Sequence, residues 1–171
     1  MTDWLAGTAE HELSPRGEAQ DIAAGILVHR LFQSGASVEG LDEQGLVACA
    51  RDLLRPEERA AIENPESTVA AAVAAWTSMR TRPDVADLLS SGRCLHEVPF
   101  SMRRDADGTP VLLRGTIDCL VQRQDGSIAV VDFKTGKRRS SHQEQLAVYL
   151  DAARTLFPGA RVEGHLIYSE P

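Results

Sequence analysis

The chain has 171 residues and a net charge of −7, and 43% of its residues are hydrophobic. This length supports one hydrophobic core, and no apolar run approaches the roughly 18–20 residues that cross a bilayer. The first residues show neither the basic nor the apolar segment of a signal peptide. We therefore expect one cytoplasmic domain over residues 1–171, without a membrane partner.

The distribution of charges and cysteines narrows the possible functions. Residues 1–69 carry 13 acidic and 5 basic side chains, a net charge of −8, whereas residues 70–171 carry 12 acidic and 13 basic side chains, a net charge of +1. A polyanionic partner is therefore compatible only with the C-terminal part. The three cysteines, Cys49, Cys94 and Cys119, lack CxxC spacing, which argues against a disulfide framework, a zinc site and an iron–sulfur cluster.

Helical patterns fill the first half of the chain. Ser14 and Pro15 form a typical helix start, and the helix that they open is expected to end near Gln33. Ile22, Ile26 and His29 fall on one side of this helix, which predicts an apolar face that carries the histidine. Further helices are expected over residues 42–54, 56–63 and 66–81, with a short turn at 84–89. Together they predict a helical subregion over about residues 14–91.

The pattern then changes to the alternation typical of strands. Residues 94–103, 111–123 and 127–134 are predicted strands, separated by turns at Asp105–Gly108 and Gln124–Gly126. Ser141–Glu144 matches a capping box that would open a helix to about Phe157, and a last strand is expected over 161–168. Since a crossover helix precedes it, that strand can lie parallel to one of the others. The prediction is an α/β fold, with a mixed sheet and crossover helix over about residues 94–169.

The hairpin around Gln124–Gly126 brings together two carboxylates and a lysine. If these three residues form a turn with Gly126 in the left-handed conformation, facing residues have numbers that sum to 250, and Asp118 lies opposite Asp132. Their Cβ atoms are then roughly 4.5–5.5 Å apart, a repulsive arrangement unless a hard divalent cation lies between them. Lys134 falls on the same face, while Val131 and Phe133 point into the core. This arrangement is typical of metal-dependent phosphodiesterases.

The residues in this order resemble a known family. Gly115–Asp118, Asp132–Gly136, the pair Gln145 and Tyr149, and the upstream Val28–Arg30 resemble the RecB-type nuclease domain of the PD-(D/E)xK superfamily, the C-terminal nuclease of AddA- and RecB-like helicase-nucleases. The resemblance covers about residues 14–168. It implies a restriction-endonuclease-like fold and a magnesium-dependent deoxyribonuclease. The implied task is exonucleolytic trimming of unwound single strands in double-strand-break repair, beside a helicase motor in cis or in trans.

The resemblance also assigns roles to individual residues. It implies a metal site formed by His29, Asp118, Asp132 and the backbone carbonyl of Phe133. Three further roles follow from it: Lys134 supports the attacking water, and Gln145 and Tyr149 orient the site and contact the DNA backbone. Glu97 matches an acidic position of less defined role. Because a histidine nitrogen suits manganese better than magnesium, Mn²⁺ should substitute for Mg²⁺.

Several alternatives remain open on the sequence alone. Asp118 and Asp132 are each compatible with ordinary strand carboxylates, and His29 with a core histidine. A catalytically silent copy that guides DNA or braces a helicase is the competing function. The chain lacks the four flanking cysteines of the family's iron–sulfur branch, and Gly136-Lys137 lacks the preceding glycine of a phosphate-binding loop, so neither a cluster nor an ATP site is expected.

Overall fold

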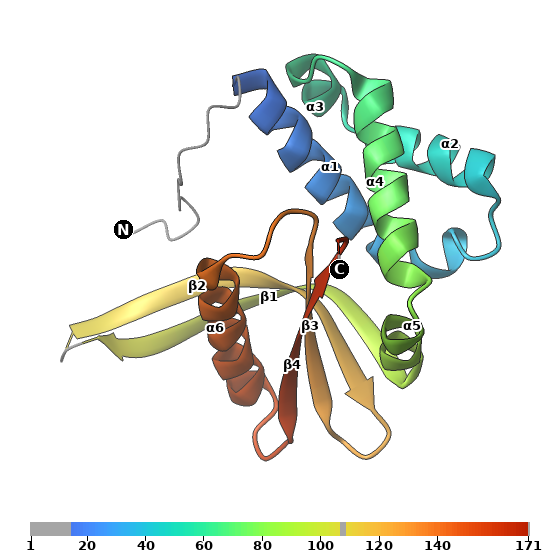
Figure 1. Cartoon of the computed structure of the whole chain (residues 1–171). Helices are drawn as coiled ribbons and strands as arrows, with labels where there is room; N and C mark the ends of the chain where they lie inside the picture. Colours follow the sequence, from blue (N-terminus) through green and yellow to red (C-terminus); the bar gives the residue numbers. More distant parts are fainter. Residues whose placement is uncertain (1–14, 107–108, 171) are drawn as a thin grey trace.

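The computed structural model of the chain describes residues 15–106 and 109–170, in which a group of helices lies over one end of a sheet (Figure 1). The predicted cap Ser14 and the tip of the Asp105–Gly108 turn lie outside these residues. The N-terminal helices are α1 (Pro15–Ser34), a 3-10 turn (Gly35–Ser37), α2 (Glu43–Leu53), α3 (Pro56–Ala61), α4 (Pro65–Arg80) and α5 (Pro83–Ser90). Every predicted helix of this region is present.

Local sequence explains where these helices begin. Asp42 Oδ1 accepts a hydrogen bond from Gly45 N at 2.8 Å before α2, and Asn64 Oδ1 accepts one from Ser67 N at 3.0 Å before α4. Each satisfies an amide that lacks a partner in the first helical turn. Proline is the first residue of α3, α4 and α5, where its missing N–H costs nothing. No helix among the described residues is long and apolar enough to cross a membrane.

The second half of the chain forms a four-stranded mixed sheet. Its elements are β1 (Gly92–Ala106), β2 (Thr109–Arg123), β3 (Ile128–Lys134), α6 (Ser140–Leu156) and β4 (Val162–Tyr168). The strand order is β1-β2-β3-β4; neighbours among the first three strands are antiparallel, and β4 is parallel to β3. The predicted capping box at Ser141 is wrong, because α6 begins at Ser140 after Arg139, whose side chain makes no capping bond.

The predicted register of the central hairpin is confirmed. Cys119 pairs with Val131 and Val121 with Ala129, so facing residues have numbers that sum to 250. Gly126 has a φ of +80°, the left-handed conformation that a three-residue hairpin turn requires and that glycine adopts without strain. The turn residue therefore sets which side chains of β2 and β3 face each other.

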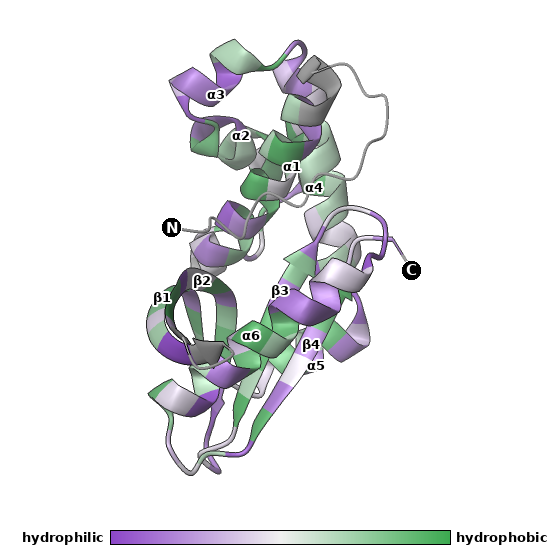
Figure 2. Cartoon of the chain, turned by 90° about the vertical axis from the view of Figure 1, so that its left-hand side faces the viewer, coloured by the Kyte–Doolittle hydropathy of each residue, from purple (hydrophilic) through white to green (hydrophobic). Residues whose placement is uncertain are grey.

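Helices cover both faces of the sheet. One core lies between α6 and residues such as Leu120 and Val130, and the other lies between α1, α4 and α5 and residues such as Val131 and Phe133. The rings of Phe32 and Phe133 stack with centroids 3.9 Å apart. Figure 2 shows the hydrophobic residues running along β3 beneath α6. The sheet centre is thus buried on both sides, as expected for a strand with a parallel neighbour.

The predicted apolar face of α1 is wrong. Ile22 and Ile26 are 58% and 37% exposed, whereas Ala23, Leu27 and Leu31 are buried. Both sets have helical spacing, so periodicity could not tell them apart; the packing of α1 against α4 and the sheet selects the second set. His29 therefore lies at the edge of the packed face, where its side chain is partly exposed.

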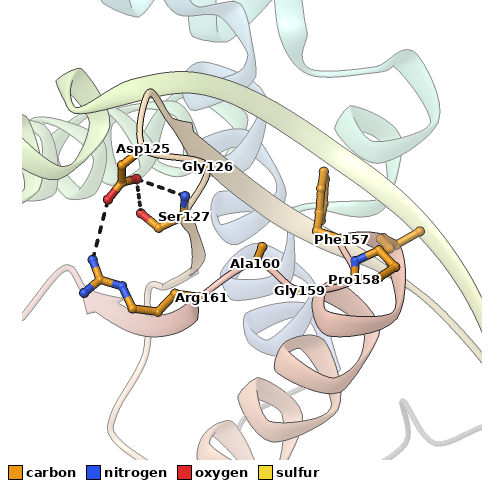
Figure 3. A pocket seen from close by; sticks show the side chains of 9 residues that line it. Asp125, Gly126, Ser127, Phe157, Pro158, Gly159, Ala160 and Arg161 are labelled. Carbon is orange, nitrogen blue, oxygen red and sulfur yellow. Dashed lines mark hydrogen bonds and ion pairs between the residues drawn. The ribbon is translucent and has the colours of Figure 1, made fainter.

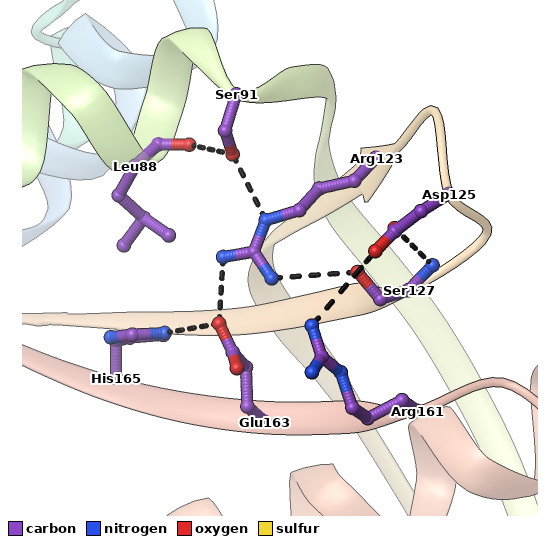
Figure 4. Close-up of polar contacts among 8 residues, drawn as sticks. All are labelled: Leu88, Ser91, Arg123, Asp125, Ser127, Arg161, Glu163 and His165. Carbon is purple, nitrogen blue, oxygen red and sulfur yellow. Dashed lines mark hydrogen bonds and ion pairs between the residues drawn. The ribbon is translucent and has the colours of Figure 1, made fainter.

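A network of polar contacts joins the strands at the end of the sheet that lies far from Asp132 (Figure 4). Arg123 donates to Glu163 at 2.6 Å and to Ser91 Oγ at 3.1 Å, which joins β2 to β4 and to α5. Asp125 accepts from Ser127 N and Oγ, which closes the β2–β3 turn. The hollow between this turn and the α6–β4 turn (Figure 3) is lined mainly by residues of these two turns and lies roughly 16 Å from Asp132 along β3.

Candidate active site

The candidate site lies at the C-terminal end of β3, and its centre is Asp132. This residue has no exposed surface, because α6 covers the face of β3 on which its side chain lies. Neither of its carboxylate oxygens has a hydrogen-bond partner among the described residues. Lys134 Nζ lies 2.9 Å from Asp132 Oδ1, close enough for an ion pair although not in hydrogen-bonding geometry. Buried charges normally have partners, so this carboxylate is suited to a cation.

Asp118 is the second carboxylate of the site. The register places it opposite Asp132, one step beyond the last paired residues, Cys119 and Val131. Its Oδ2 accepts a hydrogen bond from Phe133 N at 3.0 Å, which holds the side chain against β3. Burial raises the pKa of Asp118. Burial, together with the adjacent Asp118 carboxylate, raises the pKa of Asp132 to about 7. The two acids therefore repel each other unless a positive charge neutralises them.

His29 connects α1 to both carboxylate-bearing strands. Its Nε2 donates to the carbonyl of Phe133 at 3.1 Å, which leaves Nδ1 unprotonated in the neutral ring. Nδ1 lies 3.5 Å from Asp118 Oδ1 and 3.9 Å from Glu97 Oε1. Burial lowers the pKa of His29 and so favours this neutral form. The core-histidine alternative is less fitting, because Nδ1 faces acids rather than apolar groups.

Glu97 lies near the site at a position where the β1–β2 pairing is interrupted. Its φ is +51°, and the ladder pairs His96 with Cys119 and Val98 with Ile117 but not Glu97 with Asp118. A non-glycine residue with positive φ is uncommon and is often found at functional sites. Ligand atoms of His29, Glu97 and Asp118 all lie within 4.8 Å of one another. The alternation of residues along β1 contains no signal of this irregularity.

Lys134, Gln145 and Tyr149 form a chain of hydrogen bonds that leads into the α6 core. Lys134 Nζ donates to Gln145 Oε1 at 2.7 Å, and Gln145 Nε2 donates to Tyr149 OH at 2.8 Å. Tyr149 is buried, and burial raises the pKa of its phenol above the usual range, so the group stays neutral. This geometry favours the predicted orienting role for both residues. It leaves little of Tyr149 free to contact DNA.

The sequence is similar to a known superfamily and to parts of two curated proteins. It matches the PD-(D/E)XK nuclease superfamily over residues 5–171. It is 33% identical over 139 residues to one subunit of an ATP-dependent helicase/nuclease of Pelotomaculum thermopropionicum, an alignment that covers 71% of this chain and 10% of that protein. A protein of the same name from Moorella thermoacetica is 28% identical over 152 residues, or 79% of this chain and 10% of its own length.

The chain therefore spans about a tenth of the curated relatives that it matches. A solved structure titled SSO0001 aligns with 89% of this chain and 72% of its own, at 16% identity and a TM-score of 0.39. The mixed sheet flanked by helices is consistent with the restriction-endonuclease-like fold of the matched superfamily. Since the match extends over nearly all of the sequence, the chain belongs to the PD-(D/E)XK nuclease superfamily.

Proposed function

We propose that this chain is a magnesium-dependent deoxyribonuclease that hydrolyses phosphodiester bonds to 5′-phosphate and 3′-hydroxyl ends. The observation that carries the proposal is the buried carboxylate of Asp132, which has no hydrogen-bond partner among the described residues and lies beside Asp118 and Lys134. A buried pair of acids destabilises the folded protein unless a cation neutralises it. The silent-module alternative gives no reason to keep this arrangement.

Asp118, Asp132, His29 and the Phe133 carbonyl would hold the cation, and Glu97 is near enough to join them. The oxygens are the ligands that Mg²⁺ prefers, and the histidine nitrogen makes Mn²⁺ an effective substitute. A bound divalent cation polarises the phosphate and acidifies water. In the metal-free structure His29 donates a hydrogen bond to the Phe133 carbonyl. This hydrogen bond would have to be given up when both groups bind the same cation.

Lys134 would act on the attacking water. Its ammonium group lies beside Asp132, and Gln145 Oε1 fixes its direction. Held there, the group would orient a water molecule and offset the charge that develops on the phosphate in the transition state. Tyr149 would keep the Gln145 amide oriented so that its oxygen faces the lysine.

Unpaired cations on two segments support a DNA substrate. Arg103, Arg104 and Arg114 on the long β1–β2 hairpin are exposed and form no ion pair with a described residue. The same holds for residues 137–139, in the loop that follows the catalytic strand. Most other arginines of the described chain have an acidic partner. Exposed cations that form no ion pair with a described residue are available to DNA phosphates.

The proposed substrate is single-stranded DNA or unwound DNA ends in the cytoplasm, trimmed exonucleolytically during break repair. The relatives' name, which couples a helicase to a nuclease, supports a helicase motor in cis or in trans. Such a motor would deliver the strand that the isolated chain, at a net charge of −7, would bind only weakly.

Digestion of end-labelled linear single-stranded DNA tests this function. We expect degradation with Mg²⁺ or Mn²⁺, none with EDTA, and poor activity with Ca²⁺, whose larger shell activates water poorly. Circular single-stranded DNA is the matched control, because an exonuclease cannot start on it. Absence of degradation by the parent chain and retention of DNA binding would support the silent-module alternative.

A further inference from the structure

A second group of metal-binding side chains lies next to the candidate active site. Cys94 and His96 are two residues apart on β1 and therefore share one face of the strand. Cys119 on β2 pairs directly with His96. The two sulfurs and a ring nitrogen of His96 all lie within 4.8 Å of one another. Because the ligands come from two strands, CxxC spacing gives no sign of them.

The chemistry of this group differs from that of the catalytic carboxylates. Two thiolates and an imidazole are the ligands of a zinc ion, and two sulfurs that bind the same tetrahedral zinc are roughly 3.8 Å apart. Since the ligand atoms lie within 4.8 Å of one another, they would have to approach by at most about 1 Å to bind one ion. Cys94 Sγ now donates to the Leu89 carbonyl at 3.3 Å, a weak bond that metal binding would replace.

A cavity of about 230 Å³ adjoins two of these ligands and is large enough for water. Cys94, His96 and Trp76 line it, with Arg80 and Glu39 at its wall. Trp76 is buried, and its Nε1–H has no acceptor among the described residues. A water molecule in this cavity would accept that hydrogen bond and complete a tetrahedral site. Arg80 forms an ion pair with Glu39 at 3.2 Å. Its charge is therefore neutralised and does not repel a cation in the cavity.

We propose that Cys94, His96 and Cys119 bind one Zn²⁺ ion, with water from the cavity as the fourth ligand, and that the ion clamps β1 to β2. The clamp would act next to the one interruption of the β1–β2 pairing among the described residues. His96 and Cys119 are the last residues paired before the break at Glu97, and they adjoin the active-site carboxylates Glu97 and Asp118. Zinc would therefore stabilise the domain and hold these two acids in place.

Cobalt is the probe that separates this site from the catalytic one. The reduced, metal-free full chain is titrated with Co²⁺, and the sulfur-to-cobalt charge-transfer absorption is recorded, followed by displacement with Zn²⁺. The candidate catalytic site contains no sulfur ligand, so metal bound there is silent in this band. We expect one thiolate-bound cobalt per chain, which one equivalent of Zn²⁺ displaces. Zinc should also raise the melting temperature.

Matched variants assign the signal. Cys94→Ser should abolish the band, and His96→Gln should weaken cobalt binding at least tenfold; both residues are only half-buried, so these variants should fold. Cys49→Ser, at a half-buried thiol outside the cluster, should leave the titration unchanged. The proposal is overturned if the folded parent gives no thiolate band, if the band survives Cys94→Ser, or if mass spectrometry finds Cys94 and Cys119 joined as a disulfide under the reducing conditions used.

Discussion

Substitution of Asp132 by asparagine should make the metal-free protein more stable while removing its metal binding. Above pH 7 the folded protein holds an ionised carboxylate with no exposed surface and no hydrogen-bond donor. Its pKa of about 7, against an ordinary value of 3.8, corresponds to a cost on the order of 4 kcal/mol at pH 8. The amide that replaces the carboxylate is also buried and polar, and we expect its burial to offset about half of the gain. We expect a net stabilisation of about 2 kcal/mol.

The raised pKa of Asp132 makes the stability of the metal-free protein depend on pH. Between pH 3.8 and about 7 the folded metal-free protein binds more protons at Asp132 than the unfolded chain does, so its stability falls as the pH rises through that window. Asp132→Asn has no carboxyl group to ionise at this position. Its gain in stability over the parent should therefore be smaller at pH 5 than at pH 8.

Thermal melts in EDTA at pH 5 and pH 8 measure both effects. A gain of about 2 kcal/mol raises the melting temperature by about 4–8 °C for a chain of this length. Asp151→Asn, at a half-exposed carboxylate on α6, is the control and should change stability by less than about 0.5 kcal/mol. Calorimetry with Mn²⁺ should show no binding to Asp132→Asn. Equal melting temperatures of parent and variant at pH 8 would mean that the Asp132 carboxylate does not destabilise the fold, and parental Mn²⁺ affinity would mean that it is not a metal ligand.

Three further substitutions, one of them with a matched control, test separate parts of the site and its scaffold. Gly115→Ala would place a Cβ atom 2.9 Å from the Phe100 ring and should cost about 1–3 kcal/mol in urea unfolding, whereas Gly136→Ala, with nothing within 4 Å, should be nearly neutral. His29→Ala should weaken Mn²⁺ affinity in calorimetry; a loss of thermal stability with unchanged affinity would restore the core-histidine interpretation. Gln145→Leu removes the acceptor that directs the active-site lysine and should lower the single-turnover cleavage rate without changing Mn²⁺ affinity, so a parental rate would contradict the orienting role.

The sequence predicted those parts of the site that depend on local rules. The Gln124–Gly126 turn and the two-residue alternation of strands together placed Asp118, Asp132 and Lys134 correctly, and the structure confirms the register. The crossover helix also predicted that the last strand can lie parallel to one of the others, and the structure shows that β3 is this neighbour.

The features that the sequence missed depend on tertiary packing. The alternation along β3 placed only Val131 and Phe133 in the core, but Asp132 is buried as well, and no local pattern records which helix will cover a strand. Ile22 and Ile26 were assigned to the buried face because two apolar stripes of equal spacing run along α1. The break at Glu97 and the approach of Cys94 to Cys119 arise from pairing across two strands, which alternation alone does not encode.

The most direct test of the proposed active site is single-turnover cleavage of single-stranded DNA by Lys134→Ala at saturating Mn²⁺. The variant should bind Mn²⁺ at least as tightly as the parent, since a competing positive charge 2.9 Å from Asp132 is gone. Its cleavage rate should nevertheless fall by roughly 10²–10³, the usual contribution of one group that stabilises a transition state. Lys137→Ala, at an exposed lysine of the following loop, should keep its chemical step once DNA is saturating. Cleavage by Lys134→Ala at the parental rate would contradict the account.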